Sequence, residues 1–188
     1  MIINDNIFSI LITIFGIIYT FFAGKGKFLC FLSGIISTVL YAILAYKNGF
    51  FGNFALYFFY YLPMMIIGIF NWKKNSINNE IIKIKLKNNK RIIYFSIAIL
   101  ITVAFAFVLD KTGASSPIVD SFITIFSILA MYFTVIRALE QWVVWFMVDI
   151  AAFYMWFQCP DCIALALSRL LYTILAIYFY LEWQKQLR

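Results

Sequence analysis

The chain has 188 residues, of which 65% are hydrophobic and 12% are charged, and its formal net charge is +7. Soluble domains are about half apolar and about a quarter charged, so this composition excludes an ordinary soluble domain and predicts a helical membrane protein. The apolar runs are continuous over about 16 to 20 residues, whereas the strands of a transmembrane β-barrel alternate over about 10 residues.

Seven hydrophobic segments long enough to cross a membrane as helices follow one another along the chain. They span residues 7–22, 28–46, 54–72, 92–109, 118–136, 142–158 and 163–183. Asp5 precedes the first segment without any basic residue, so this segment does not resemble a cleavable signal peptide and we expect it to be kept. All residues are expected to serve one transmembrane domain.

A polar connector at residues 73–91 carries seven basic residues against the single acid Glu80, so the positive-inside rule places it in the cytoplasm. Twelve basic residues then fall on the cytoplasmic side and two, Lys47 and Lys111, on the other. This split predicts an outside N-terminus and a cytoplasmic C-terminus. The basic residues flank membrane segments and form no basic face, which argues against nucleic-acid binding.

A weak internal repeat supports the odd number of segments. Three residues at the end of the third segment recur 111 positions later at the end of the seventh, where Tyr61, Trp72 and Lys74 match Tyr172, Trp183 and Lys185. The sequence Ile-Phe-Ser-Ile-Leu also occurs at both 7–11 and 125–129. These matches predict an all-α fold with two three-helix repeats, 7–72 and 118–183, joined by one linker helix at 92–109.

The inventory of reactive residues argues against an enzyme. The chain has no histidine and no P-loop, and we expect no catalytic residue, metal site or cofactor. Asp149 is the one acid that we place at membrane depth, because the other seven acids fall in loops or at segment ends. A transporter fits best. A membrane enzyme would need a second catalytic group beside Asp149, and a non-transporting membrane subunit is a second alternative.

The sixth segment places Trp142, Trp145 and Asp149 on one helix face, with Trp156 further along the same stripe. An ionisable group at membrane depth normally faces a protein interior or a water-filled cavity. Indole walls beside one polar group would suit a small ring-bearing solute. Alternatively, the outer tryptophans are interface anchors and Asp149 makes a helix-packing contact. A carboxylate turned toward lipid, or locked into contacts between helices with no void beside it, would count against a carrier.

The third segment is the expected partner wall, because Asn53, Tyr57, Tyr60 and Met64 follow a helical stripe. We expect Pro63 to interrupt this helix and to free a backbone carbonyl. Ordinary core packing is the alternative for this stripe.

The three cysteines do not indicate a particular function. Cys159 and Cys162 lie in a predicted outer loop, where a disulfide and two free thiols are both open, and a zinc site lacks further ligands. Cys30 lies inside a segment and is expected to behave as a small hydrophobic residue.

Three stretches carry a resemblance to a known family: PMMIIGIFNW at 63–72, Trp142-x-x-Trp145-x-x-x-Asp149, and the closing Leu181-Glu-Trp183. The chain resembles the bacterial PnuC-type vitamin transporters, named for nicotinamide riboside uptake. The resemblance implies a 3+1+3 fold similar to the SWEET proteins in the bacterial inner membrane. It also implies facilitated diffusion by alternating access, without ion or ATP coupling. A cytoplasmic kinase would then trap the solute by phosphorylation.

Two positions depart from the family pattern, which has Asn where this chain has Asp149 and Gln where it has Met65. The loss of this amide pair puts the choice of ring or base in doubt. Nicotinamide riboside is the first expectation, and thiamine, riboflavin or a deoxynucleoside is the alternative. Expected partners are the small-molecule substrate, membrane lipids and the kinase; a homo-oligomer is compatible with the sequence.

Overall fold

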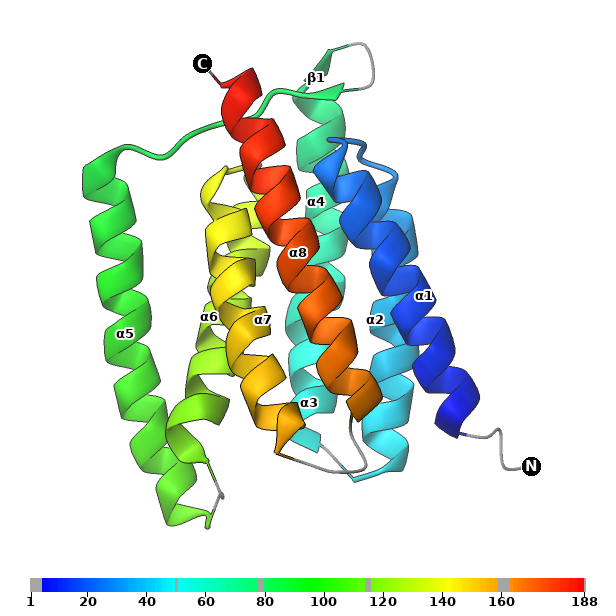
Figure 1. Cartoon of the computed structure of the whole chain (residues 1–188), viewed down its shortest axis with the longest axis vertical. Helices are drawn as coiled ribbons and strands as arrows, with labels where there is room; N and C mark the ends of the chain where they lie inside the picture. The colour runs from blue at the N-terminus through cyan, green and yellow to red at the C-terminus, as the bar shows by residue number, and fades with distance from the viewer. Residues whose placement is uncertain (1–4, 50, 78–79, 114–115, 159–162, 188) are drawn as a thin grey trace. The chain divides into compact units, whose positions relative to one another are not determined.

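A computed structural model describes residues 5–49, 51–77, 80–113, 116–158 and 163–187, nearly all of them in helices (Figure 1). The chain divides into two compact units. Unit 1 comprises Met1–Ile82 and Val135–Arg137, and unit 2 comprises Lys83–Thr134 and Ala138–Arg188. Each unit contains apolar helices and has its own packed interior.

Unit 1 contains a first pair of helices and a longer third one. Helices α1 and α2 span Asp5–Gly24 and Cys30–Lys47 and lie side by side, and the third helix consists of α3 at Phe51–Leu56, η1 at Tyr57–Tyr61 and α4 at Leu62–Lys74. Phe31 of α2 packs edge-on against Trp72 of α4, with ring centroids 5.0 Å apart. Gly68 makes this close approach possible, since a Cβ there would lie 2.3 Å from the Phe31 ring.

The third helix is continuous across Pro63, so the expected interruption is wrong. The five residues of η1 form a π turn, in which Leu62 N–H donates to the Tyr57 carbonyl. A π turn pairs carbonyls with amides five residues onward and so accommodates a position that lacks an N–H. The π turn also rotates the residues that follow it relative to those before it. A stripe predicted from a constant spacing of three or four residues therefore does not stay on one face of this helix.

The polar connector contains a small hairpin that the sequence did not predict. Strands β1 (Ser76–Ile77) and β2 (Glu80–Ile81) pair antiparallel. Ile81 N–H donates to the carbonyl of Gly26 between α1 and α2, and the Lys27 Nζ lies 3.4 Å from the Glu80 carboxylate. Strands of two residues leave no recognisable alternation, which explains why the pattern missed them.

Unit 2 contains four helices, α5 at Asn88–Lys111, α6 at Pro117–Val135, α7 at Glu140–Phe157 and α8 at Ile163–Gln186. Tyr94 of α5 contacts Tyr132 of α6 through its hydroxyl at 3.2 Å. Phe95 of α5 lies edge-on to Phe126 of α6, at 6.1 Å between centroids. Helices α7 and α8 lie side by side along much of their length.

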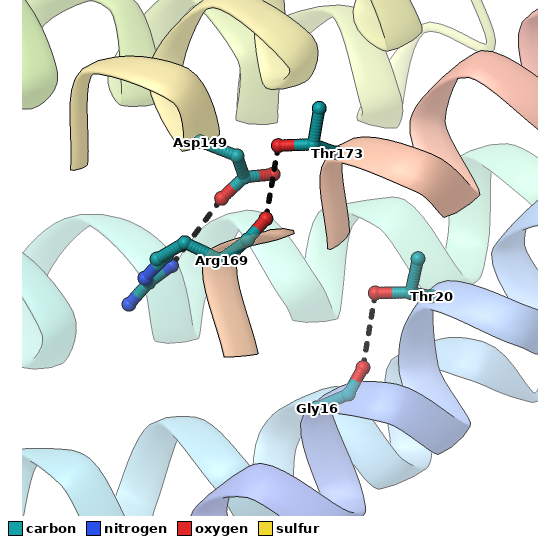
Figure 2. Close-up of polar contacts among 5 residues, drawn as sticks. All are labelled: Gly16, Thr20, Asp149, Arg169 and Thr173. Carbon is teal, nitrogen blue, oxygen red and sulfur yellow. Dashed lines mark hydrogen bonds and ion pairs between the residues drawn. The ribbon is translucent and has the colours of Figure 1, made fainter. Parts of the chain in front are cut away.

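The expected segments match these helices to within a few residues at each end. Among the described residues, five helices are long and apolar enough to cross a membrane: α1, α2, the composite third helix, α5 and α6. Large apolar side chains such as Phe59, Phe70 and Leu100 are exposed, as expected for a surface solvated by lipid. Threonine hydroxyls donate to carbonyls four residues back, as Thr20 does to Gly16 (Figure 2).

Candidate functional site

Trp142, the first tryptophan of the sequence motif, is a packing residue in this conformation. Its side chain is buried and contacts Phe179 and Trp183 of α8, with ring centroids 5.4 and 5.6 Å away. The Trp183 ring is nearly perpendicular to it, at 85°. Trp142 therefore joins α7 to α8.

Trp145 has a different environment, although it lies only one turn further along α7. It is half-buried, and its indole Nε1 donates to the hydroxyl of Thr134 on α6 at 3.2 Å. Thr134 is buried and donates in turn to the Ala130 carbonyl at 2.9 Å. The chain of two hydrogen bonds fixes the edge of the ring, so a face of the ring is the part of Trp145 best suited to a ligand.

Asp149 is buried, with 4% exposure, and it has a charged partner. The Arg169 Nη1 of α8 lies 3.4 Å from the Asp149 Oδ1 (Figure 2). Asp149 therefore contacts a neighbouring helix, through a partner that the sequence had not identified. The face containing Trp142 and Asp149 is turned toward α8, while Trp145 reaches α6.

Arg169 is the residue that sequence reasoning missed. It lies six positions after the start of α8, near the expected outer end of the last segment, and we had assigned it to no site. Its guanidinium also lies 5.9 Å from the centroid of the Tyr172 ring, and its carbonyl accepts the Thr173 hydroxyl at 2.9 Å. Two opposite charges inside neighbouring apolar helices normally pair, and this rule would have found the contact.

The unit 1 candidates have several distinct environments. Tyr57 stacks on Tyr41 of α2 at 4.0 Å and on Tyr61 at 4.9 Å, so both faces of its ring have aromatic neighbours. Met65 is buried beside Gly34 of α2. These two residues pack inside unit 1.

The remaining unit 1 candidates are more accessible. Tyr60 and Met64 are half-buried, and Asn53 is exposed. A cavity of about 110 Å³ lies between α2 and the third helix, and Thr38, Phe54 and Tyr57 contribute to its largely apolar wall. The structure therefore separates the predicted stripe into packed and accessible positions.

Two buried donors beside the motif have no hydrogen-bond partner within the described ranges: the Gln141 Nε2 and the Trp142 Nε1. Gln141 is 1% exposed. A buried donor without an acceptor costs about 1 to 3 kcal/mol, which makes both atoms candidate contacts for a polar group of a ligand. The sequence had not identified Gln141 as a candidate.

The cysteine and metal expectations have different outcomes. Cys30 is a buried free thiol within a helix, as expected of a small apolar residue. Cys159 and Cys162 lie outside the described residues. Within the described part of the chain, no three His, Cys, Asp or Glu side chains gather as metal ligands would.

Comparisons with known proteins agree with the earlier resemblance. The nicotinamide riboside transporter PnuC of Neisseria mucosa is 27% identical over 181 residues, which cover 90% of this chain and 69% of that protein. The protein of the same name from Haemophilus influenzae is 27% identical over 185 residues, covering 96% and 80%.

A crystal structure of the vitamin B3 transporter PnuC matches 96% of this chain and 82% of its own, with a TM-score of 0.79 and 25% identity. The family described as nicotinamide mononucleotide transporter matches residues 6–185. The resemblance to the PnuC-type transporters is thereby confirmed, and the chain belongs to this family of membrane transporters.

Proposed function

We propose that this protein takes up nicotinamide riboside by facilitated diffusion across the bacterial inner membrane. The observation that carries the proposal is the arrangement on α7, where the anchored Trp145 ring lies one turn from the Asp149–Arg169 pair. An indole face would stack on the pyridinium ring, and the carboxylate would accept hydrogen bonds from ribose hydroxyls.

The ion pair favours hydroxyl recognition over recognition of a bare cation. Arg169 offsets the negative charge of Asp149, so the pair as a whole offers little net attraction to a cation. A single contact at 3.4 Å is longer than the roughly 2.7 to 2.9 Å of a strong charge-assisted hydrogen bond. A carboxylate has about four lone-pair positions, so Asp149 keeps acceptor capacity for a ligand.

The same pair does not rule out a carrier, contrary to our criterion that a carboxylate locked between helices would count against one. Family membership establishes a transporter, and one long contact to a partly exposed arginine is a weak restraint. A bound hydroxyl group would compete with this contact for the Asp149 carboxylate.

Nicotinamide mononucleotide, which the family description names, differs from the riboside by a phosphate. Phosphate oxygens near Asp149 would meet a buried carboxylate, and Arg169 is already engaged with it. We therefore expect the riboside to be preferred over the mononucleotide.

The 3+1+3 organisation, with 7–72 and 118–183 as repeats and 92–109 as linker, is part of the proposal. It is supported by contacts that recur at the same offset of 111 residues inside each unit. The pair Phe31 and Trp72 corresponds to the edge-on pair Trp142 and Trp183. Two unrelated helix bundles would not share ring pairs in one register.

The turns that begin the second helix of each proposed repeat give independent support. Lys27 N–H bonds to the Phe22 carbonyl in unit 1, and Ala138 N–H bonds to the Phe133 carbonyl in unit 2. The preceding residues, Gly26 and Arg137, have φ of 67° and 65°. Both turns are therefore the same helix-ending motif, at equivalent positions.

Transport into proteoliposomes tests the substrate. Purified protein should take up radiolabelled nicotinamide riboside until inside and outside concentrations are equal. Uptake should exceed that of thiamine, riboflavin, deoxynucleosides and nicotinamide mononucleotide. An enclosed kinase with ATP should raise the total label retained, because phosphorylation keeps the free concentration low. Accumulation of free riboside above the outside level without the kinase would contradict facilitated diffusion.

Two substitutions test the site. Trp145→Ala and Asp149→Asn should each weaken binding of the riboside, measured by titration of the purified protein. Unchanged affinity in both variants would remove α7 from the site. Tyr60→Ala and Met64→Ala test in the same way whether these two accessible residues of unit 1 bind the riboside.

The proposed topology has a separate test. Reporter fusions should place the connector and the C-terminus in the cytoplasm and the N-terminus outside.

A further inference from the structure

Glu140, at the first position of α7, is a buried acid that the transport mechanism above does not use. Its side chain is 7% exposed and lies 2.6 Å from the Arg91 Nη2 of α5. The backbone N–H of Leu86 donates to both of its carboxylate oxygens, at 3.2 and 3.3 Å. One carboxylate thus binds two segments that precede it by about fifty residues.

Residues 83–87, here called the strap, form the end of the connector and reach the same end of unit 2 at three further points. The Ile84 carbonyl accepts the N–H of Leu139 at 2.8 Å. Lys83 hydrogen-bonds the Gln186 side chain and lies 5.1 Å over the Trp183 ring. Residue 84 of the strap therefore binds the peptide N–H just before α7, and residue 86 binds the side chain of the first residue of α7.

The two residues bound by the strap, Leu139 and Glu140, lie just before the tryptophan motif. The N–H of Trp142 donates to the Leu139 carbonyl, and the Leu139 N–H is held by the strap. Trp183, which lies under Lys83, packs edge-on against the Trp142 ring. The residue that accepts the Trp142 N–H and the ring that packs against Trp142 are thus both in contact with the strap.

The turn itself does not need this acid. The equivalent turn of unit 1 shares three backbone hydrogen bonds and a positive φ with this turn, but Leu29 occupies the position equivalent to Glu140 and is 49% exposed. The contacts of the Glu140 carboxylate with Arg91 and with the Leu86 N–H, here called the clasp, are therefore specific to unit 2. The clasp attaches the strap and α5 to the first turn of α7.

We propose that Glu140 is a positioning residue for substrate binding, which acts by fixing the first turn of α7 and with it Trp142 and Trp145. This inference rests on the proposed function, since it assigns the role through the proposed binding helix. Loss of the clasp leaves the helices intact but lets the start of α7 and the packed Trp142 ring move, so Trp145 is less well ordered for the ligand.

The variants are Glu140→Gln, which removes the charge at constant shape, and Arg91→Met, which removes the partner. Arg91→Lys retains the charge and serves as the conservative rescue. Glu80→Gln is the matched control, because Glu80 pairs with Lys27 at 3.4 Å in an exposed position of the same connector.

The first measurement is hydrogen exchange of the α7 amides in the purified protein, which requires no substrate. Residues 141–144 should exchange about tenfold faster in Glu140→Gln and Arg91→Met than in wild type, and at wild-type rates in Arg91→Lys and Glu80→Gln. Unchanged exchange in the first two variants would overturn the proposal. If Glu140→Gln does not fold, Arg91→Met decides, because Arg91 is partly exposed and tolerates replacement better.

The second measurement is uptake of nicotinamide riboside into proteoliposomes, corrected for folded protein. KM should rise about fivefold or more in Glu140→Gln and Arg91→Met while the maximal rate changes little, as expected for lost ligand positioning. A lower melting temperature with wild-type KM would show a purely structural role and overturn the proposal. Absence of riboside uptake by the wild type would instead overturn the proposed function, and the exchange rates would still decide whether Glu140 positions α7.

Discussion

The two units pack their helices around equivalent ring pairs, but different residues fill the space at equivalent positions. In unit 1, Gly68 lets the Phe31 ring approach Trp72 closely. In unit 2 the position 111 residues after Gly68 is Phe179, which contacts Trp142 directly. Unit 1 thus fills its interior by bringing helix backbones together, and unit 2 fills it with additional rings.

The polar residues differ more than the apolar ones. Thr38 is buried in α2, whereas the equivalent residue in α7 is Asp149, which pairs with Arg169. Leu29 is likewise replaced by Glu140. The comparison teaches that shared packing builds both units, while buried charge, which needs a specific partner, is concentrated in unit 2. Four sets of substitutions test this difference.

The largest expected effect is on the ion pair of unit 2. Arg169→Met leaves a buried carboxylate unpaired and should reduce the free energy of unfolding by about 3 kcal/mol, the low end of the usual range because Arg169 is partly exposed. Asp149→Asn should cost much less, and the double variant should recover most of the loss. Thermal unfolding in detergent measures all three. Equal melting temperatures for Arg169→Met and wild type would show that the pair contributes no stability.

A smaller effect is expected at the close approach in unit 1. Gly68→Ala places a methyl group 2.3 Å from the Phe31 ring, and the forced shift should cost about 2 kcal/mol. Gly52→Ala is the matched control, because no atom lies within 4 Å of a Cβ at that helical glycine. If both variants unfold at the same temperature, backbone approach is not what unit 1 depends on.

The two tryptophans of α7 should respond differently. Trp145→Ala should weaken riboside binding about tenfold through loss of stacking, with a modest effect on folding. Trp142→Ala should mainly lower the melting temperature, because its ring is buried against Phe179 and Trp183. Ligand titration and thermal unfolding of both variants provide the comparison. If Trp142→Ala weakens riboside binding and Trp145→Ala mainly lowers the melting temperature, Trp142 belongs to the site.

The smallest effect is expected at the equivalent turns. Gly26→Ala puts a side chain at φ of 67° and should cost about 1 kcal/mol. Arg137→Gly removes the same strain from the turn between α6 and α7 but also loses the hydrogen bond from the Arg137 Nη1 to the Ile82 carbonyl at 2.9 Å. We expect the two contributions to Arg137→Gly nearly to cancel in the melting temperature. A large loss in that variant would show that the hydrogen bond outweighs the strain.

Much of the fold could be predicted because lipid imposes a simple rule on the sequence. Backbone groups in a membrane must be satisfied within the helix, so long apolar runs identify helices such as α1 and α5 without reference to any partner. The offset of 111 residues was also visible in Tyr61, Trp72 and Lys74. Local spacing failed at Tyr57–Tyr61, where the π turn changes the phase of the helix, and in the two-residue strands of the connector.

The sequence by itself determined that the protein lies in a membrane, where its helices begin and end, and that a tryptophan motif with an acid lies on α7. Each of these follows from residues close together in the chain. Only the tertiary structure decided that Asp149 pairs with Arg169, that Trp142 is packed while Trp145 is anchored by its edge, and that Glu140 binds the strap. Such contacts join residues 11 to 54 positions apart, and their geometry depends on how neighbouring helices are rotated, which composition and periodicity do not specify.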